Sequence, residues 1–295
     1  MNSKYYIPSG SAATPYTVDV TPESAGWSES SLQVVEVTEE HALHLQTEGV
    51  EVMVLPLAGS GSVECDDMTY ELSPRASVFD GPADMVYIGL GNSYTLRGDG
   101  RFAICGARAS RTLPNRRVAA HDVPVELRGA GNCSRQVHNF GAAGVFEADS
   151  LIAVEVITPG GNWSSYPARK HDENTAHESA LEEIYYFEIA PGPDGSRGFG
   201  YHRVYGTHQR PIEVLEEVRT GDVVLVPHGY HGPSVAAPGY HMYYLNVMAG
   251  PSAERAWKIV DDPEHAWLRS TWDDQAVDSR LPLHVSKSTA NPGAR

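Results

Sequence analysis

The sequence predicts an all-β protein built from two copies of one β domain. Strand-like runs rich in β-branched and aromatic residues, with partial alternation of apolar and polar positions, recur along most of the chain. The 295 residues include 28 glycines and 20 prolines, which suits short strands and turns better than long helices. Residues 72–96 also resemble residues 218–245 in their order of turn, strands and Pro/Gly break. The chain is long enough for about two domains, so this repeat predicts a duplicated β-sandwich or jelly roll.

The first half is a series of predicted strands with no helical periodicity over 32–110. Residues 1–30 are rich in Ser, Thr and Pro and predict an arm or an irregular first strand. The strand-like runs that follow are separated by turn residues and lie at 31–37, 42–46, 50–59, 62–66, 68–72, 76–90, 93–98 and 101–109. We therefore expect a first domain over 1–127.

Strand-like runs return in the second half after a polar, Gly-rich connector at 110–140. They lie at 150–161, 163–171, 181–190, 198–206, 212–218, 222–227 and 240–250. Residues 254–271 change pattern and predict some helix, and residues 285–295 predict a disordered tail. The second domain is expected over 128–284.

Composition excludes several classes of protein. A net charge of −16 argues against a nucleic-acid partner, because such binding depends on cationic patches, although a small anionic substrate needs only a local Arg or Lys. The N-terminus shows no signal-peptide pattern, and no apolar run is long enough to cross a membrane. The three cysteines are far apart, which predicts buried thiols rather than disulfides. These features predict a cytoplasmic protein.

Histidines are concentrated in the second half of the chain. A β-sheet core rarely needs them, whereas a metal site or an acid–base site does need them. Residues two apart in a strand share a face, so Arg169 and His171 point the same way, as do Glu183, Tyr185 and Phe187. The seven histidines between 171 and 241 are His171, His177, His202, His208, His228, His231 and His241. The run 220–232, with its Pro-His-Gly-Tyr-His ending, presents His231. This order of segments is typical of a cupin barrel, whose metal is held by His and Glu side chains.

The motifs of the second half resemble those of the 5-deoxy-glucuronate isomerases of myo-inositol catabolism, bicupins related to 5-keto-4-deoxyuronate isomerase. The residues that carry the resemblance are RGAGNCSRQVHN (128–139), NWSSYP (162–167), KHD (170–172), LEEIYY (181–186), GFGYHRVY (198–205), GDVVLVPHGYH (221–231), PGYHMYYLNVMAGP (238–251) and DPEHAW (262–267). The first half is similar more loosely, through FDGPADMVYIG (79–89). The resemblance implies a bicupin: two jelly-roll barrels with a few short helices and the active site in the second.

The resemblance implies one divalent metal ion, Zn, Mn, Fe or Ni, held by His171, Glu183 and His231. Glu178 and Glu182 compete with Glu183 for the carboxylate role. The family carries histidine at position 169, where this chain has an arginine that cannot bind a metal. Three arrangements are open: a three-ligand site, loss of the metal with Arg169 paired to Glu183, or a substitute ligand from His177, His202 or His228. The first domain has no matching set, and we expect it to be structural.

The implied reaction converts 5-deoxy-glucuronate to 5-dehydro-2-deoxy-gluconate by moving a carbonyl between C1 and C2, through proton relay or hydride shift. Partners would be a small uronate and, in a homo-oligomer, further copies of the chain. A cupin dioxygenase and a non-enzymatic sugar-binding cupin are the alternatives. The candidate catalytic residues are Glu183, His202 and Tyr185, and the candidate substrate-binding residues are Arg169, Arg203, Tyr205 and Tyr244.

Overall fold

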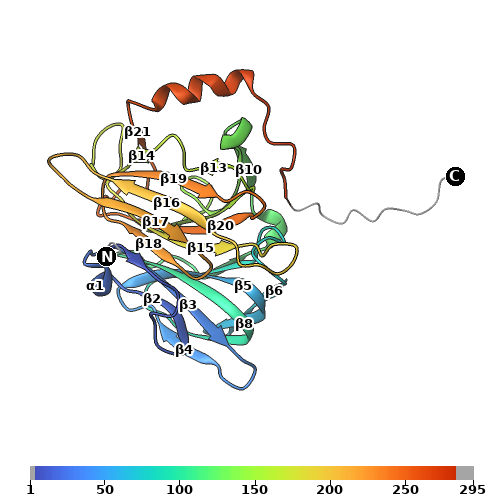
Figure 1. Ribbon diagram of the computed structural model, residues 1–295. Helices are drawn as coiled ribbons and strands as arrows, with labels where there is room; N and C mark the ends of the chain where they lie inside the picture. Colours follow the sequence, from blue (N-terminus) through green and yellow to red (C-terminus); the bar gives the residue numbers. More distant parts are fainter. Residues whose placement is uncertain (1–3, 284–295) are drawn as a thin grey trace.

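The computed structural model describes residues 4–283, which form two stacked β domains (Figure 1). The N-terminal domain is one antiparallel eight-stranded sheet in the order β2-β3-β8-β5-β7-β9, with β4 paired to β8 and β6 to β5. Its strands are β2 (Tyr16–Val20), β3 (Ser30–Val37), β4 (Leu43–Gln46), β5 (Val50–Cys65), β6 (Met68–Arg75), β7 (Met85–Ile88), β8 (Ser93–Arg108) and β9 (Arg116–Val118).

The C-terminal domain contains two antiparallel sheets. The seven-stranded sheet has the order β1 (Tyr6–Ile7), β18 (Val223–Val226), β15 (Glu182–Ile189), β20 (Met242–Ala249), β12 (Ile152–Thr158), β11 (Arg135–Gly141) and β10 (Val125–Arg128). The six-stranded sheet has the order β17 (Glu213–Val218), β16 (Gly200–Tyr205), β19 (Tyr230–Ala236), β14 (Arg169–Lys170) and β21 (Val260–Asp261), with β13 (Trp163–Ser164) paired to β19. The short helices are α1 (Pro22–Ala25), η1 (Ala120–Asp122), η2 (Gly131–Cys133) and η3 (Ala266–Asp274).

Glycines allow the two longest strands of the N-terminal domain to lie unusually close. β5 and β8 each run for 16 residues and pair along their length, with a register shift between Pro56 and Ala58. A Cβ at Gly59 would lie 2.1 Å from the carbonyl oxygen of Asp99, and Gly98 adopts a φ of +148°. Side chains other than hydrogen are excluded here, and a bulge beside such glycines is a common way to curve a sheet.

Three large clusters of buried apolar side chains form most of the core. One lies within the N-terminal domain and includes Val54 and Phe102, and one lies within the C-terminal barrel and includes Phe187 and Val214. The third and largest joins the seven-stranded sheet to the N-terminal domain. Side chains alternate along β15 between two buried environments. Ile184 and Tyr186 pack between the domains, while Tyr185, Phe187 and Ile189 face the barrel interior. The site-bearing strand is therefore fixed from behind.

A buried polar network crosses the domain boundary. The Arg75 guanidinium donates to Glu155 Oε1 at 2.7 Å and to the carbonyl oxygens of Pro56, Val78 and Gly81. The second oxygen of Glu155 lies 3.0 Å from His138 Nδ1. Burial by itself raises the pKa of Glu155, but Arg75 and His138 outweigh it and hold the pKa at about 2. The Glu155 carboxylate is thus charged and fully buried, and its charge is balanced mainly by Arg75 of the N-terminal domain.

The all-β duplicated architecture predicted from the sequence is confirmed, and the helix expected within 254–271 is partly present as η3, which Figure 1 places over the top of the C-terminal domain. Two segments differ from the expected division. The N-terminal arm contributes β1 to the edge of the C-terminal sheet, and β10 pairs with β11, so the chain changes domain between Val118 and Val125.

All three cysteines are free and buried. No helix of residues 4–283 is long and apolar enough to cross a membrane. The expected tail at 285–295 lies outside the described residues.

Replacing Arg75 by Met should lower the free energy of unfolding by about 3–5 kcal/mol, because it leaves Glu155 charged and buried without its guanidinium partner. Arg97→Met is the control, since Arg97 pairs with Glu64 on an exposed surface and should contribute at most about 1 kcal/mol. Urea titration followed by tryptophan fluorescence measures both. Equal losses in the two variants would show that the buried pair does not couple the domains.

Candidate metal centre and adjoining cavity

The two sheets of the C-terminal domain bring together His171, Glu183 and His231. β14 pairs with β19 at Arg169 opposite His231, and His171 directly follows β14. β15 presents Glu183 on the same face as Tyr185, as the alternation of the sequence predicts. All three side chains are buried, with Glu183 and His231 fully inaccessible. Segments 60 residues apart in the chain thus converge inside the barrel.

The two imidazole rings aim at one carboxylate oxygen. His171 Nε2 and His231 Nε2 each lie 3.0 Å from Glu183 Oε2, and the ring centroids are 4.6 Å apart. The Nδ1 atoms face the carbonyl oxygens of Leu181 and Gly229, at 3.3 and 3.2 Å. The tautomer with its proton on Nδ1 donates to these carbonyls and leaves the Nε2 lone pair for a metal ion, whereas without a metal a proton on Nε2 accounts for the contacts with Glu183.

The convergence of possible ligand atoms fits a cation. His231 Nε2 and Glu183 Oε1 are buried and have no hydrogen-bond partner among the described residues. Within residues 4–283 these three side chains form the single group whose ligand atoms all lie within 4.8 Å of one another. Two imidazole nitrogens and a carboxylate are the donors that Zn, Mn, Fe or Ni accept. The residues present therefore fit a divalent metal ion.

Electrostatics keep the cluster in its ligand form. Burial raises the pKa of Glu183, but His231 and His171 together outweigh it and leave the pKa well below its usual range. Burial, assisted by the positive charge of Arg169, lowers the pKa of His231 to about 4. At neutral pH the carboxylate is charged and His231 is neutral, which are the forms that bind metal.

The competing carboxylates have other partners. Glu178 accepts two hydrogen bonds from Lys170 Nζ, at 2.8 and 2.9 Å, and Glu182 faces the N-terminal domain, where it accepts from the backbone N–H of Ser28, Glu29 and Ser30. Both are held away from the imidazoles. Of the three predicted carboxylates, the structure brings only Glu183 to the histidines.

Asp172 joins the two histidine-bearing segments. Its side chain accepts hydrogen bonds from Lys170 Nζ at 2.8 Å, Arg210 Nη1 at 3.0 Å and the backbone N–H of Gly229 at 2.9 Å. Gly229 also provides the carbonyl that faces His231 Nδ1. One carboxylate thus ties the end of β14 to the turn before His231, which fixes the spacing of the cluster.

Arg169 lies between the cluster and a cavity. Its guanidinium donates to the carbonyl oxygen of His231 at 3.2 Å and to the Tyr185 hydroxyl at 3.1 Å. No ion pair with Glu183 forms, so the arrangement in which Arg169 directly pairs with that carboxylate is not observed. His177 is exposed and His228 half-buried, and neither they nor His202 belongs to the cluster of residues 4–283.

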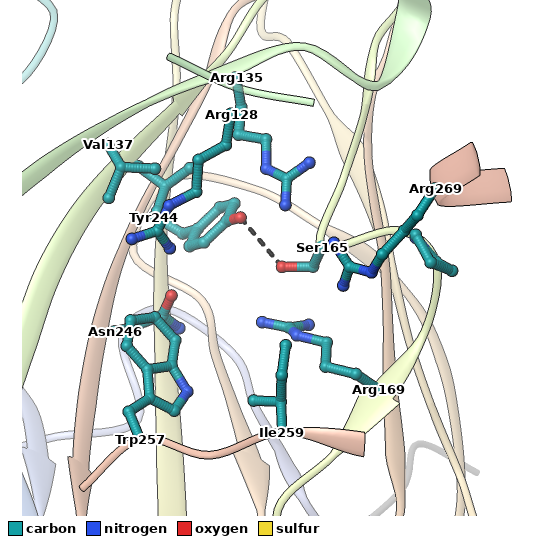
Figure 2. Close-up of a pocket in the computed structure, with 12 residues that line it drawn as sticks. Arg128, Arg135, Val137, Ser165, Arg169, Tyr244, Asn246, Trp257, Ile259 and Arg269 are labelled. Atoms are coloured by element: carbon teal, nitrogen blue, oxygen red, sulfur yellow. Dashed lines mark hydrogen bonds between the residues drawn. The ribbon is translucent and has the colours of Figure 1, made fainter. Parts of the chain in front are cut away.

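The cavity beside Arg169 has a volume of about 290 Å³ and a strongly cationic lining. Figure 2 shows four guanidinium groups directed into it from different sides. The arginines come from β10, β11, β14 and η3, and are Arg128, Arg135, Arg169 and Arg269. Ser165 and Tyr244 line the same cavity and are hydrogen-bonded to each other at 3.0 Å. Such a lining is suited to a small anion with several oxygen atoms.

Tyr185, Tyr244 and His202 lie together on the inner face of the barrel, with Tyr185 next to the His231 ring. The Tyr244 hydroxyl is 2.5 Å from Ser164 Oγ, and Tyr185 contacts Arg169. His202 packs against the Tyr185 ring, with centroids 4.4 Å apart, and its Nδ1 is 2.7 Å from Ser234 Oγ. Burial and the neighbouring His231 lower the pKa of His202 to about 3, so the ring is neutral.

The structure corrects the expected inward orientation of Arg203 and Tyr205. His202 and Val204 point into the barrel, so strand alternation directs their neighbours to the outer face. There Arg203 lies over the Tyr205 ring and 3.9 Å from Glu213 in the adjacent strand. Neither side chain reaches the arginine-lined cavity.

Sequence reasoning assigned no role to most of the cavity lining, including its other polar residues. Arg128 and Arg135 lie in RGAGNCSRQVHN, a motif noted above without a role for either arginine. Asn246 lies two residues after Tyr244, so strand alternation could have placed it on the same face. Trp257 and Arg269 come from the irregular segment after β20 and carry no local signal.

The fold and this cluster define a bicupin with a two-histidine, one-carboxylate centre in its second domain. The KduI/IolB family matches residues 5–268, and the chain belongs to this family. The resemblance predicted from the motifs is confirmed.

Named relatives cover most of the chain. The 5-deoxy-glucuronate isomerase of Geobacillus thermodenitrificans (strain NG80-2) is 44% identical over 256 residues, which is 85% of this chain and 90% of the relative. The isomerase of the same name from Bacillus subtilis (strain 168) is 42% identical over 223 residues, 74% of this chain and 79% of the relative.

Solved structures agree with the fold. An IolB-like protein from Salmonella typhimurium LT2 has a TM-score of 0.82 and 34% identity, covering 90% of this chain and 98% of that one. The oxalate decarboxylase of Lactobacillus farciminis has a TM-score of 0.58 at 10% identity, covering 88% and 89%, and shares the fold.

Replacing Arg169 by His should tighten binding of Zn²⁺ and Mn²⁺ about 10-fold or more, because it adds a neutral donor and removes a positive charge beside the ion. Calorimetric titration of metal-free protein measures the change. Arg97→His, on the exposed surface of the other domain, is the matched control. If Arg169→His binds neither metal more tightly than wild type, position 169 does not contribute to the metal centre.

Proposed function

We propose that this protein is a ketol isomerase that converts 5-deoxy-glucuronate to 5-dehydro-2-deoxy-gluconate in myo-inositol catabolism. The relatives that cover most of the chain carry the name of this enzyme. The observation that carries the proposal is the cationic cavity directly beside a buried His–Glu–His cluster. A uronate needs both parts: cationic donors for its carboxylate and a polar centre for its carbonyl.

His171, Glu183 and His231 would hold one divalent ion, either Zn, Mn, Fe or Ni. Such an ion polarises a carbonyl and stabilises the negative charge that develops on its oxygen. A cation in the cluster would repel Arg169, whose guanidinium lines the cavity and would face an anion bound there. Tyr185 and Tyr244 are placed to donate to the oxygens of C1 and C2, and Tyr244 is oriented by Ser164 and Ser165.

Isomerisation requires a proton to leave C2 and return to C1, while the hydroxyl proton passes from O2 to O1. We assign the transfer between carbons to Glu183, whose Oε1 is buried, anionic and without a hydrogen-bond partner among the described residues. His202 is the second candidate: its Nε2 also lacks a partner there, but its ring is packed behind Tyr185. Both groups are unprotonated at neutral pH, as a base must be.

We further propose a cytoplasmic homo-oligomer. Large apolar side chains are exposed on the outer six-stranded sheet and on η3, including Leu215 and Trp267, which are 65% and 64% exposed. Apolar surface of this kind commonly marks contacts between proteins. Three free, buried thiols agree with a reducing compartment.

Glu183→Gln should lower turnover of 5-deoxy-glucuronate by about 10²-fold or more, because the neutral amide neither balances a divalent ion nor accepts the C2 proton. NMR in deuterated buffer follows the carbonyl and the exchange at C2, and elemental analysis follows the metal. Glu64→Gln, on the exposed surface of the N-terminal domain, is the control. Absence of turnover by metal-loaded wild type would overturn the proposed reaction, and oxygen uptake would favour a dioxygenase.

A further inference from the structure

The four arginines of the cavity differ in how their charges are balanced. Arg128 lies 2.8 Å from Glu126 Oε2, and Arg269 forms a two-pronged ion pair with Asp261. Arg135 and Arg169 have no carboxylate within ion-pair distance among residues 4–283. The polar contact of Arg135 is a hydrogen bond from Nη1 to the carbonyl oxygen of Cys133 at 3.1 Å. Two positive charges therefore face the cavity without a counter-ion.

Two further donors in this cavity have no acceptor. Asn246 is 2% exposed and its Nδ2 is buried without a hydrogen-bond partner among the described residues, and the same holds for the indole Nε1 of Trp257. Both residues line the cavity (Figure 2). A buried donor left unpaired is unfavourable, so these groups suit a ligand that supplies acceptors. Hydroxyl and carboxylate oxygens meet this requirement.

The two unbalanced arginines occupy different ends of the cavity. Arg169 contacts Tyr185 and the backbone of His231, next to the His–Glu–His cluster. Arg135 begins β11, which is separated from the Glu183 strand β15 by β20 and β12. Figure 2 shows Arg135 and Arg169 entering from opposite sides, with Tyr244 and Asn246 along the wall between them. A short polyhydroxy chain can span this arrangement with an anionic group at the Arg135 end.

We propose that Arg135 binds the carboxylate of the substrate and thereby makes the enzyme selective for uronates over neutral aldoses, while Arg169 faces the reacting C1–C2 end. Asn246 and Trp257 donate to the hydroxyl groups between the ends. Burial and the nearby Arg169 and Arg128 lower the pKa of Arg135 to about 10, in keeping with a buried guanidinium that has no carboxylate partner. This assignment rests on the proposed function.

Arg135→Gln should raise KM for 5-deoxy-glucuronate about 10- to 100-fold with kcat changed much less, because a charge-assisted, two-pronged contact to the unreacting end is lost. Arg135→Lys keeps the charge but not the fork and should fall between wild type and Arg135→Gln. Arg97→Gln is the arginine control on the opposite domain. Unchanged KM in Arg135→Gln, or a fall in kcat alone, would overturn the assignment.

Calorimetry with D-glucuronate and D-glucose separates this inference from the proposed reaction. Wild type and Arg97→Gln should bind glucuronate at least about 10-fold more tightly than glucose, and Arg135→Gln should lose that preference. If the preference depends on Arg135 but no isomerisation occurs, the carboxylate site stands and the proposed reaction fails. If isomerisation occurs and Arg135→Gln keeps the preference, the carboxylate lies elsewhere. Thermal unfolding of each variant identifies any that misfold. If Arg135→Gln misfolds, the glucuronate and glucose affinities of Arg135→Lys are compared with those of wild type instead.

Discussion

Two imidazole rings and one carboxylate meet inside the second barrel in a way that calls for a cation. Each Nδ1 faces a backbone carbonyl, and each Nε2 lies 3.0 Å from an oxygen of Glu183. Atoms of this kind, sealed from water, are stabilised at such a distance by a shared proton or by a metal ion between them. The chemistry of the site depends on this close approach of two imidazole nitrogens and a carboxylate oxygen, and the surrounding fold holds the three groups in place.

The fold imposes the geometry through strands that are fixed on both faces. β15 packs against the N-terminal domain through Ile184 and Tyr186 and against the barrel core through Tyr185 and Phe187. Asp172 ties the His171 segment to the turn before His231. The first domain therefore has a role in the site although it contributes no ligand: it provides the support that holds Glu183 in a buried, unfavourable place. The Arg75–Glu155 network strengthens that support across the boundary.

The local sequence pattern predicted which face of β15 carries Glu183 and where the turn before His231 lies. It did not predict the orientation of residues 201–205 or the cavity. The phase of β15 follows from Glu183, Tyr185 and Phe187, and the Pro–Gly turn before His231 follows from its residue types. The run Tyr-His-Arg-Val-Tyr at 201–205 is polar and aromatic in both phases, so its sequence could not show that His202 points inward and Arg203 outward. The cavity could not be predicted from the sequence either, because Arg128, Arg135 and Arg269 come from separate elements that only the tertiary fold brings together.

The central claim, a cation held by two imidazoles and one carboxylate with arginine in the place of a fourth ligand, is tested most directly by X-ray absorption spectroscopy of the zinc-loaded protein. We expect one tightly bound zinc per chain, whose scattering shell contains two imidazole nitrogens, with the remaining ligands oxygen. Loss of half the imidazole signal in His231→Ala would assign one of them. A wild-type spectrum with three or more imidazoles, or protein that takes up no zinc at all, would contradict the account.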